Sequence, residues 1–175
     1  MKKSIGIAFS GVICALSVVL LFLGSVVWIF AYVMPIVTGL LMIILTESLS
    51  KKTALAVYCS TGILSMLLLP DKESALLYIL FFGYYPILKP SIEKIKQKFL
   101  CVIAKLVVFN AGVVLSQVLC VYVFGMPVEE FLGKVGIVLM LLAANIIFFF
   151  YDKLLFALVF LYNKKYKKVV EKYLK

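Results

Sequence analysis

Long apolar runs separated by short polar segments organise this sequence. Each run has a length that suits a helix crossing the hydrocarbon core of a bilayer. The pattern predicts an all-α, polytopic membrane protein, a six-transmembrane-helix bundle that forms one domain over residues 1–175. The expected spans lie at about residues 5–23, 31–49, 53–69, 75–88, 101–124 and 134–151.

The ends of two of these runs leave alternatives open. The first run follows Lys2 and Lys3 and also resembles a signal peptide. Because apolar residues continue into the next run, we interpret it as a retained helix. The last run is expected to stop near Tyr151, before a basic cytoplasmic tail over residues 152–175, although the pattern also allows an interfacial helix from Asp152 to Tyr162.

The positions of the lysines predict the orientation of the bundle. With the N-terminus inside, every inner connection is basic. The predicted outer loops hold only Lys72 and Lys134, next to Asp71, Glu73, Glu129 and Glu130. Cytoplasmic loops carry an excess of positive charge in membrane proteins. The N-terminus and C-terminus are therefore predicted to be cytoplasmic, in a bacterial cytoplasmic (inner) membrane.

Composition supports the same environment. Hydrophobic residues make up 65% of the chain and charged residues 15%. A soluble domain has about half apolar and about a quarter charged residues. The net charge of +10 fits anionic lipid head groups, because the lysines cluster at the ends of the apolar runs. A nucleic-acid partner is not expected.

Few residues have the chemistry that a membrane enzyme needs. The chain has no His and no Arg, and its two Asp residues, Asp71 and Asp152, are predicted on opposite sides of the membrane. The four cysteines lie inside apolar runs without a C-x-x-C pair, so we interpret them as packing residues. We expect no enzyme activity, no metal site and no cofactor.

Polar and aromatic residues at depth are the remaining candidates for a site. Asn110 and Gln117 share a face of the fifth run, and Asn145 lies near the middle of the sixth. Such amides either bond neighbouring helices or mark a site. Trp28, Tyr32, Tyr78 and Tyr122 lie near the predicted outer surface. They suit either an interfacial aromatic belt or stacking on a ligand.

Two further segments also allow two interpretations. The aromatic run over residues 81–86 is either a functional bend or lipid-facing filler, and filler is favoured. Ala8, Gly11 and Ala15 form a stripe of small residues in the first run, which allows another helix to approach closely. The stripe either packs inside the bundle or docks a separate membrane subunit, and its coverage by the other helices would distinguish the two.

The architecture and this stripe resemble the substrate-binding S-components of energy-coupling factor (ECF) vitamin transporters. The stretch Leu69–Lys89 is also similar to small bacterial membrane proteins of S-component type. The resemblance implies a small vitamin-like ligand bound from outside. It also implies a transmembrane coupling subunit and an ATPase pair as partners, with docking at Ala8, Gly11 and Ala15. It places the ligand near Trp28, Tyr32, Tyr78, Gln117, Tyr122 and Asn145.

Two other functions compete with a solute-binding subunit. One is a non-catalytic structural or scaffold membrane protein resembling the cell-shape factor MreD, which would need no ligand pocket. The other is a membrane enzyme acting on lipid, which would need ionisable residues within hydrogen-bond reach of one another.

Overall fold

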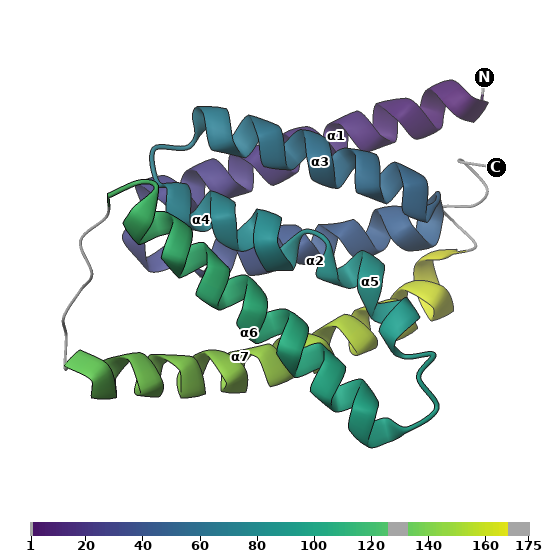
Figure 1. Cartoon of the computed structure of the whole chain (residues 1–175). Helices are drawn as coiled ribbons and strands as arrows, with labels where there is room; N and C mark the ends of the chain where they lie inside the picture. The colour runs from purple at the N-terminus through teal and green to yellow at the C-terminus, as the bar shows by residue number, and fades with distance from the viewer. Residues whose placement is uncertain (1, 126–132, 168–175) are drawn as a thin grey trace.

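The computed structural model describes residues 2–125 and 133–167 (Figure 1). This part of the chain is helical and contains no strand. Its elements are, in chain order, α1 (Lys2–Val26), the 3-10 helix η1 (Trp28–Phe30), α2 (Val33–Ser48), α3 (Lys51–Leu68), α4 (Lys72–Leu77), the π-helix η2 (Tyr78–Phe82), α5 (Tyr85–Ile92), α6 (Lys98–Tyr122), α7 (Gly133–Leu161) and the π-helix η3 (Tyr162–Tyr166).

Four helical segments in the described residues are long and apolar enough to cross a membrane: Ser4–Val26, Lys72–Ile92, Lys98–Tyr122 and Val138–Lys165. They correspond to the first, fourth, fifth and sixth predicted spans. The other two predicted spans are also helical. However, α2 has only 16 residues, and the 18 residues of α3 begin with two lysines.

The helices run alternately in opposite directions, so the start of α1 and the end of α7 lie at the same end of the bundle (Figure 1). We call this end the terminal end, and the end with the α1–α2 and α3–α4 connections the loop end. The topology prediction places the loop end outside the cell. α2 is central, because it contacts α1, α3, α4, η2, α5 and α7.

The fourth predicted span is a broken helix rather than a continuous one. Proline has no N–H to donate and clashes with the carbonyl four residues earlier, so Pro86 leaves the Phe82 carbonyl without its helical donor. The chain widens into η2 here, where the Gly83 N–H bonds to the Tyr78 carbonyl at 2.7 Å. The Tyr151 hydroxyl, from α7, lies 3.5 Å from the Phe82 carbonyl oxygen and donates to it.

Glycines on two neighbouring helices allow close approach to η2. A Cβ at Gly39 of α2 would lie 2.5 Å from the Phe82 carbonyl oxygen. A Cβ at Gly112 of α6 would lie 2.6 Å from the Leu80 carbonyl oxygen. Neither position leaves room for a side chain, so the backbone of η2 is held between α2 and α6.

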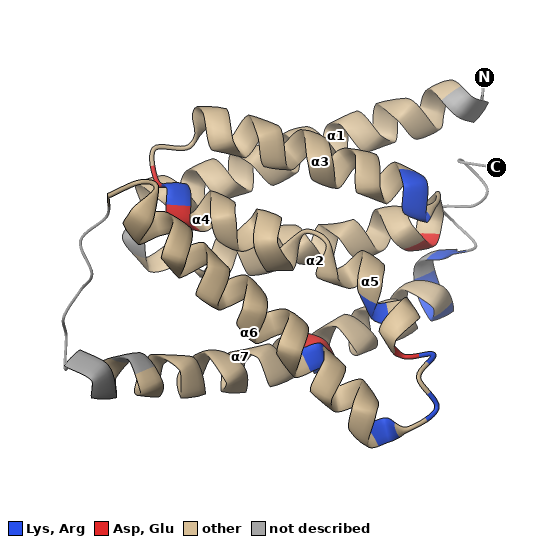
Figure 2. Cartoon of the chain, in the orientation of Figure 1, with Lys and Arg blue, Asp and Glu red and all other residues tan. Residues whose placement is uncertain are grey.

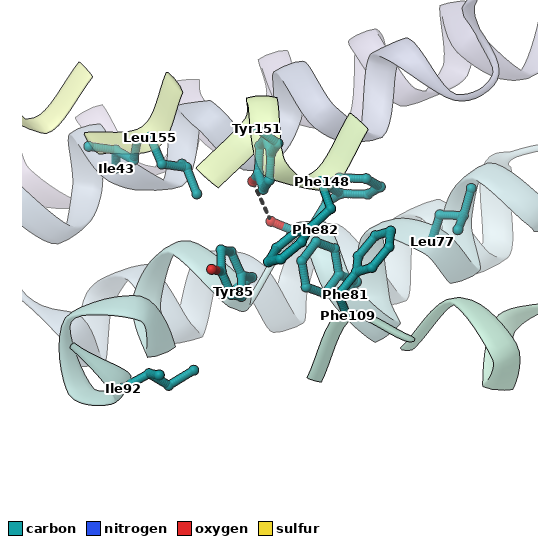
Figure 3. Close-up of a cluster of buried hydrophobic side chains, with 10 residues drawn as sticks. All are labelled: Ile43, Leu77, Phe81, Phe82, Tyr85, Ile92, Phe109, Phe148, Tyr151 and Leu155. Atoms are coloured by element: carbon teal, nitrogen blue, oxygen red, sulfur yellow. Dashed lines mark hydrogen bonds between the residues drawn. The ribbon is translucent and has the colours of Figure 1, made fainter. Parts of the chain in front are cut away.

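Aromatic side chains fill the core around η2 (Figure 3). Phe81 is fully buried. Its ring contacts those of Phe82, Tyr85, Phe109, Phe148 and Tyr151, with centroids 4.8–6.2 Å apart. The preference for lipid-facing filler over residues 81–86 is therefore wrong for Phe81, Phe82 and Tyr85.

The predicted boundary near Tyr151 does not end a helix, because α7 continues to Leu161. Leu155 is 1% exposed and belongs to the aromatic core. Two turns further on, the Tyr162 hydroxyl bonds to the Ser48 hydroxyl of α2 at 2.5 Å. Residues 152–162 are therefore part of the packed bundle and not of a tail. The charged Asp152 is compatible with this packing, because its carboxylate pairs with Lys89 of α5 and Lys105 of α6.

Candidate functional site

Charged side chains from α5, α6 and α7 meet in the interior of the bundle, near its terminal end. Figure 2 shows acidic and basic positions next to each other where α6 crosses α7. Asp152 of α7 is at the centre. Its Oδ1 accepts from Lys89 Nζ at 2.6 Å and from the Tyr85 hydroxyl at 2.7 Å. Its Oδ2 accepts from Lys105 Nζ at 2.9 Å.

Glu93, just beyond the end of α5, completes this charge network. Its Oε1 lies 2.8 Å from Lys105 Nζ and 3.6 Å from Lys89 Nζ. The side chain of Lys89 is 6% exposed, that of Lys105 12% and that of Asp152 21%. Two ammonium groups and two carboxylates give a net charge of zero, which is how charges buried in an apolar bundle are usually compensated.

The charge network was not predicted from the sequence. Lys89 and Lys105 were interpreted only as inner lysines that fix the topology. A signal was present: Lys89 directly follows the fourth apolar run, and Lys105 lies inside the fifth, seven residues into α6. Lysines at such depth need acidic partners, and Asp152 is an acidic residue at a similar depth.

A cleft of about 190 Å³ opens next to the charge network. Its polar lining comes from Thr46, Glu47, Lys89 and Glu93, and its apolar walls come from α2, α5 and α7. Ligand pockets for drug-sized molecules measure about 300–1,000 Å³, so a vitamin-sized ligand exceeds this cleft. The cleft also lies at the terminal end, away from the predicted ligand-binding residues.

A second polar group, at the loop end, contains two of the predicted ligand-binding residues. Glu73 of α4 accepts from the Tyr32 hydroxyl at 3.1 Å and from Gln117 Nε2 at 2.7 Å. These three side chains, which we call the Glu73 cluster, come from the residue before α2, from α4 and from α6. They are partly exposed, so a polar ligand approaching the loop end would meet them.

The neighbouring charged residues have structural roles. The Asp71 carboxylate caps the start of α4 by accepting from the backbone N–H groups of Glu73 and Ser74. Lys72 Nζ donates to the carbonyl oxygens of Met66 and Leu69 at the end of α3, at 2.9 and 2.7 Å. Both interactions satisfy backbone groups that helix ends leave free. Glu129 and Glu130 lie outside the described residues.

Asn145, another predicted ligand-binding residue, pairs with Asn110. Asn110 Nδ2 donates to Asn145 Oδ1 at 2.9 Å, and Asn145 Nδ2 donates to Asn110 Oδ1 at 3.0 Å. The reciprocal pair joins α6 to α7 where they cross. This geometry corresponds to the interhelical interpretation of the two amides.

Two of the remaining predicted ligand-binding residues, Tyr78 and Tyr122, do not join the Glu73 cluster. Tyr78 is fully buried, and its ring packs with Leu21, Leu69 and Ala75. Tyr122 is 83% exposed at the end of α6. Trp28 lies in η1, and its side chain is outside the described part of the structure.

The small-residue stripe on α1 lies on the surface. Ala8, Gly11 and Ala15 are all exposed. A Cβ at Gly11 would have no atom within 4 Å. α1 packs on α2 and α3 through its opposite side, where Ile13, Ser17 and Leu21 are buried. The described residues of the bundle therefore leave this face uncovered.

Fold and site together define a chain whose described part is all-helical and whose apolar helices are compatible with a membrane protein. Across the described residues, no group of three or more His, Cys, Asp and Glu side chains is placed to hold a metal ion. No protein-family model, curated protein or solved structure matches the chain.

Proposed function

We propose that this chain is a six-span solute-binding subunit of an ECF-type uptake transporter in a bacterial cytoplasmic membrane, with both termini in the cytoplasm. Its solute is a small vitamin-like or other micronutrient molecule taken from outside. Energy would come from a transmembrane coupling subunit and an ATPase pair, because the chain has no phosphate-binding G-x-x-x-x-G-K-[ST] loop.

The observation that supports this proposal most is the uncovered face of α1. Small residues at helical spacing let two helices approach closely, which is a main source of helix association in lipid. Ala8, Gly11 and Ala15 do not serve this purpose inside the bundle, because all three are exposed. A helix of a separate membrane subunit would pack closely against this face, which is the contact that small residues favour.

The Glu73 cluster supports the solute-binding part of the proposal. It brings together Tyr32 and Gln117, which are 85 residues apart in sequence, on one carboxylate at the predicted outer end. A carboxylate, an amide and a phenol offer a ligand both hydrogen-bond donors and acceptors.

Solute binding is tested by purifying the protein and identifying co-purified small molecules by mass spectrometry. The wild type is expected to retain a ligand, and Gln117→Leu to lose most of it. Gln97→Leu makes the same change at an exposed position at the terminal end and should retain the wild-type amount. Retention by Gln117→Leu equal to that of the control would contradict the role of the Glu73 cluster.

Docking is tested separately, by isolating the tagged chain from its native membrane. Gly11→Leu should remove a co-isolated transmembrane subunit and its ATPase pair, because the added side chain separates the helices. Val107→Leu, at a position of α6 that is 60% exposed, should not. Isolation of cell-envelope proteins without a bound small molecule or an ATPase pair would favour the scaffold function instead.

A further inference from the structure

Two groups of hydroxyl side chains in the described helices differ in their hydrogen bonding. The first group bonds to a carbonyl of its own helix one turn earlier, at 2.7–2.8 Å, an arrangement that is known for Ser and Thr inside helices. Its members are Ser10, Ser25, Thr46 and Ser116. The second group is Ser17, Thr38 and Ser65. These three are fully buried, and their oxygens have no hydrogen-bond partner among the described residues.

Contacts and helical spacing bring two of these hydroxyls toward Tyr78. The Tyr78 hydroxyl lies 3.8 Å from Met42 Sδ and also interacts with the Thr61 side chain. Thr38 is one turn before Met42 on α2, and Ser65 is one turn after Thr61 on α3. Residues four apart share a helix face, so both hydroxyls face the interior that surrounds Tyr78.

The third hydroxyl reaches the same interior from α1. Ser17 is one turn before Leu21, which packs against the Tyr78 ring. It is also one turn after Cys14, whose Sγ accepts from Thr61 Oγ1 at 3.4 Å. We call the hydroxyls of Ser17, Thr38, Thr61, Ser65 and Tyr78 the hydroxyl core. It is built from α1, α2, α3 and η2.

The partners available inside the hydroxyl core are chemically weak. Cys14 and Met42 supply sulfur atoms, which accept hydrogen bonds poorly. Buried hydroxyls are unfavourable without a partner, and buried polar groups that lack one in proteins commonly bind internal water. No residue of the hydroxyl core is charged, so a molecule that it binds must be neutral and both donate and accept hydrogen bonds.

We propose that the hydroxyl core is an internal water-binding site, in which water bridges Ser17, Thr38 and Ser65 around the Tyr78 hydroxyl. Water is the smallest neutral molecule that can serve several hydroxyls at once. The site is separate from the Glu73 cluster. Its existence does not depend on the proposed transport function.

Radiolytic footprinting of the purified full chain tests this proposal, because hydroxyl radicals generated from bound water oxidise the side chains next to it. Met42 and Tyr78 are both 0% exposed, so radicals from bulk solvent do not reach them. Tyr151 is the matched control: it is 2% exposed but surrounded by aromatic rings. Tyr32, which is 48% exposed, serves as the positive control.

With water bound, Met42 and Tyr78 are oxidised many times faster than Tyr151. The Ser17→Ala/Thr38→Val/Ser65→Ala variant should reduce the oxidation of Met42 to the level of Tyr151, with Tyr32 unchanged. Oxidation of Met42 and Tyr78 in the wild type that is as slow as that of Tyr151 would overturn the proposal, and this comparison needs no variant.

Thermal unfolding gives a second measurement with a definite sign. If Thr38 bonds to water, Thr38→Val removes a satisfied hydroxyl and lowers the unfolding midpoint. If Thr38 has no partner, the same change removes an unfavourable buried group and raises the midpoint. Thr46→Val is the control on the same helix, because the Thr46 hydroxyl bonds to the Met42 carbonyl at 2.7 Å. A higher midpoint for Thr38→Val would contradict the proposal.

Discussion

The charge network and the hydroxyl core differ in whether their buried polar groups have hydrogen-bond partners within the described part of the chain. In the charge network, at the α5–α7 side of the bundle, each carboxylate oxygen of Asp152 accepts from at least one lysine. In the hydroxyl core, between α1, α2, α3 and η2, Ser17, Thr38 and Ser65 have no partner among the described residues. Charges are far more unfavourable than hydroxyls when buried alone.

The difference follows from the higher free-energy cost of burying a charge without a partner. An unpaired charge would not be tolerated in an apolar bundle, so the network has to be complete within the chain. A small molecule can form the hydrogen bonds that a buried hydroxyl needs, so the partner of the hydroxyl does not have to be a protein group. The network is therefore expected to fix the positions of α5, α6 and α7, whereas the hydroxyls of Ser17, Thr38 and Ser65, unpartnered among the described residues, place no such requirement on α1, α2 and α3. Three sets of substitutions test the comparison.

Asp152→Asn should have the largest effect, because it leaves Lys89 and Lys105 with Glu93 as their one acidic partner in the network. Breaking a buried ion pair costs about 3–5 kcal/mol. We expect roughly 3 kcal/mol, the low end of that range, because the Asp152 side chain is 21% exposed. The measurement is the free energy of unfolding in detergent micelles. Glu93→Gln, at a side chain that is 40% exposed, should cost clearly less.

A loss for Asp152→Asn no greater than that for Glu93→Gln would show that the network is not organised around Asp152. Lys89→Met gives an independent comparison. It leaves Asp152 paired with Lys105, so its cost should fall between those of the other two variants.

The helices were predictable, because an apolar run of spanning length is a local property of the sequence. The charge network was not, since it joins residues 47 and 63 positions apart. The same holds for the Glu73 cluster: Tyr32 and Gln117 were expected near a ligand, but nothing local to them indicates that they share Glu73 as a partner.

Phe81 shows a second limit of sequence interpretation. In a water-soluble helix the apolar face identifies the core, because the opposite face is polar. In an apolar run meant for lipid, both faces are apolar, so the pattern does not separate core from lipid-facing residues. The run around Phe81 was therefore assigned to lipid, although Phe81 is fully buried and contacts five other rings.

Gly39→Ala should have the second-largest effect, because Gly39 lies where α2 meets η2, between the two regions. The added Cβ would lie 2.5 Å from the Phe82 carbonyl oxygen and 2.6 Å from the Tyr151 hydroxyl. Overpacking costs about 1–3 kcal/mol, and Ala recovers up to about 1 kcal/mol through its better helix propensity. We expect a net loss of roughly 1–2 kcal/mol in the free energy of unfolding.

Gly11→Ala is the matched control for this change. The same methyl group would meet no atom within 4 Å, so only the propensity term applies and the variant should be as stable as the wild type or slightly more stable. If Gly39→Ala were equally stable, the close contact between α2 and η2 would not hold the two regions together.

The smallest expected effect concerns the Asn110–Asn145 pair, a fully partnered polar pair without charge. Both side chains of the pair have a partner, as in the charge network. Neither carries a charge, as in the hydroxyl core. Interhelical hydrogen bonds in membranes contribute about 0.6 kcal/mol each on average. A double-mutant cycle with Asn110→Leu and Asn145→Leu should therefore give a coupling energy of roughly 1 kcal/mol.

Each single Leu variant leaves one amide without its partner, so the double variant should be more stable than the sum of the two losses predicts. The single variants should still cost less than Asp152→Asn, because an orphaned amide is less unfavourable than an orphaned ammonium group. A coupling energy near zero would show that the pair does not join α6 to α7. In that case the charge network and the aromatic rings around Phe81 would be the main contacts that hold α7 in place.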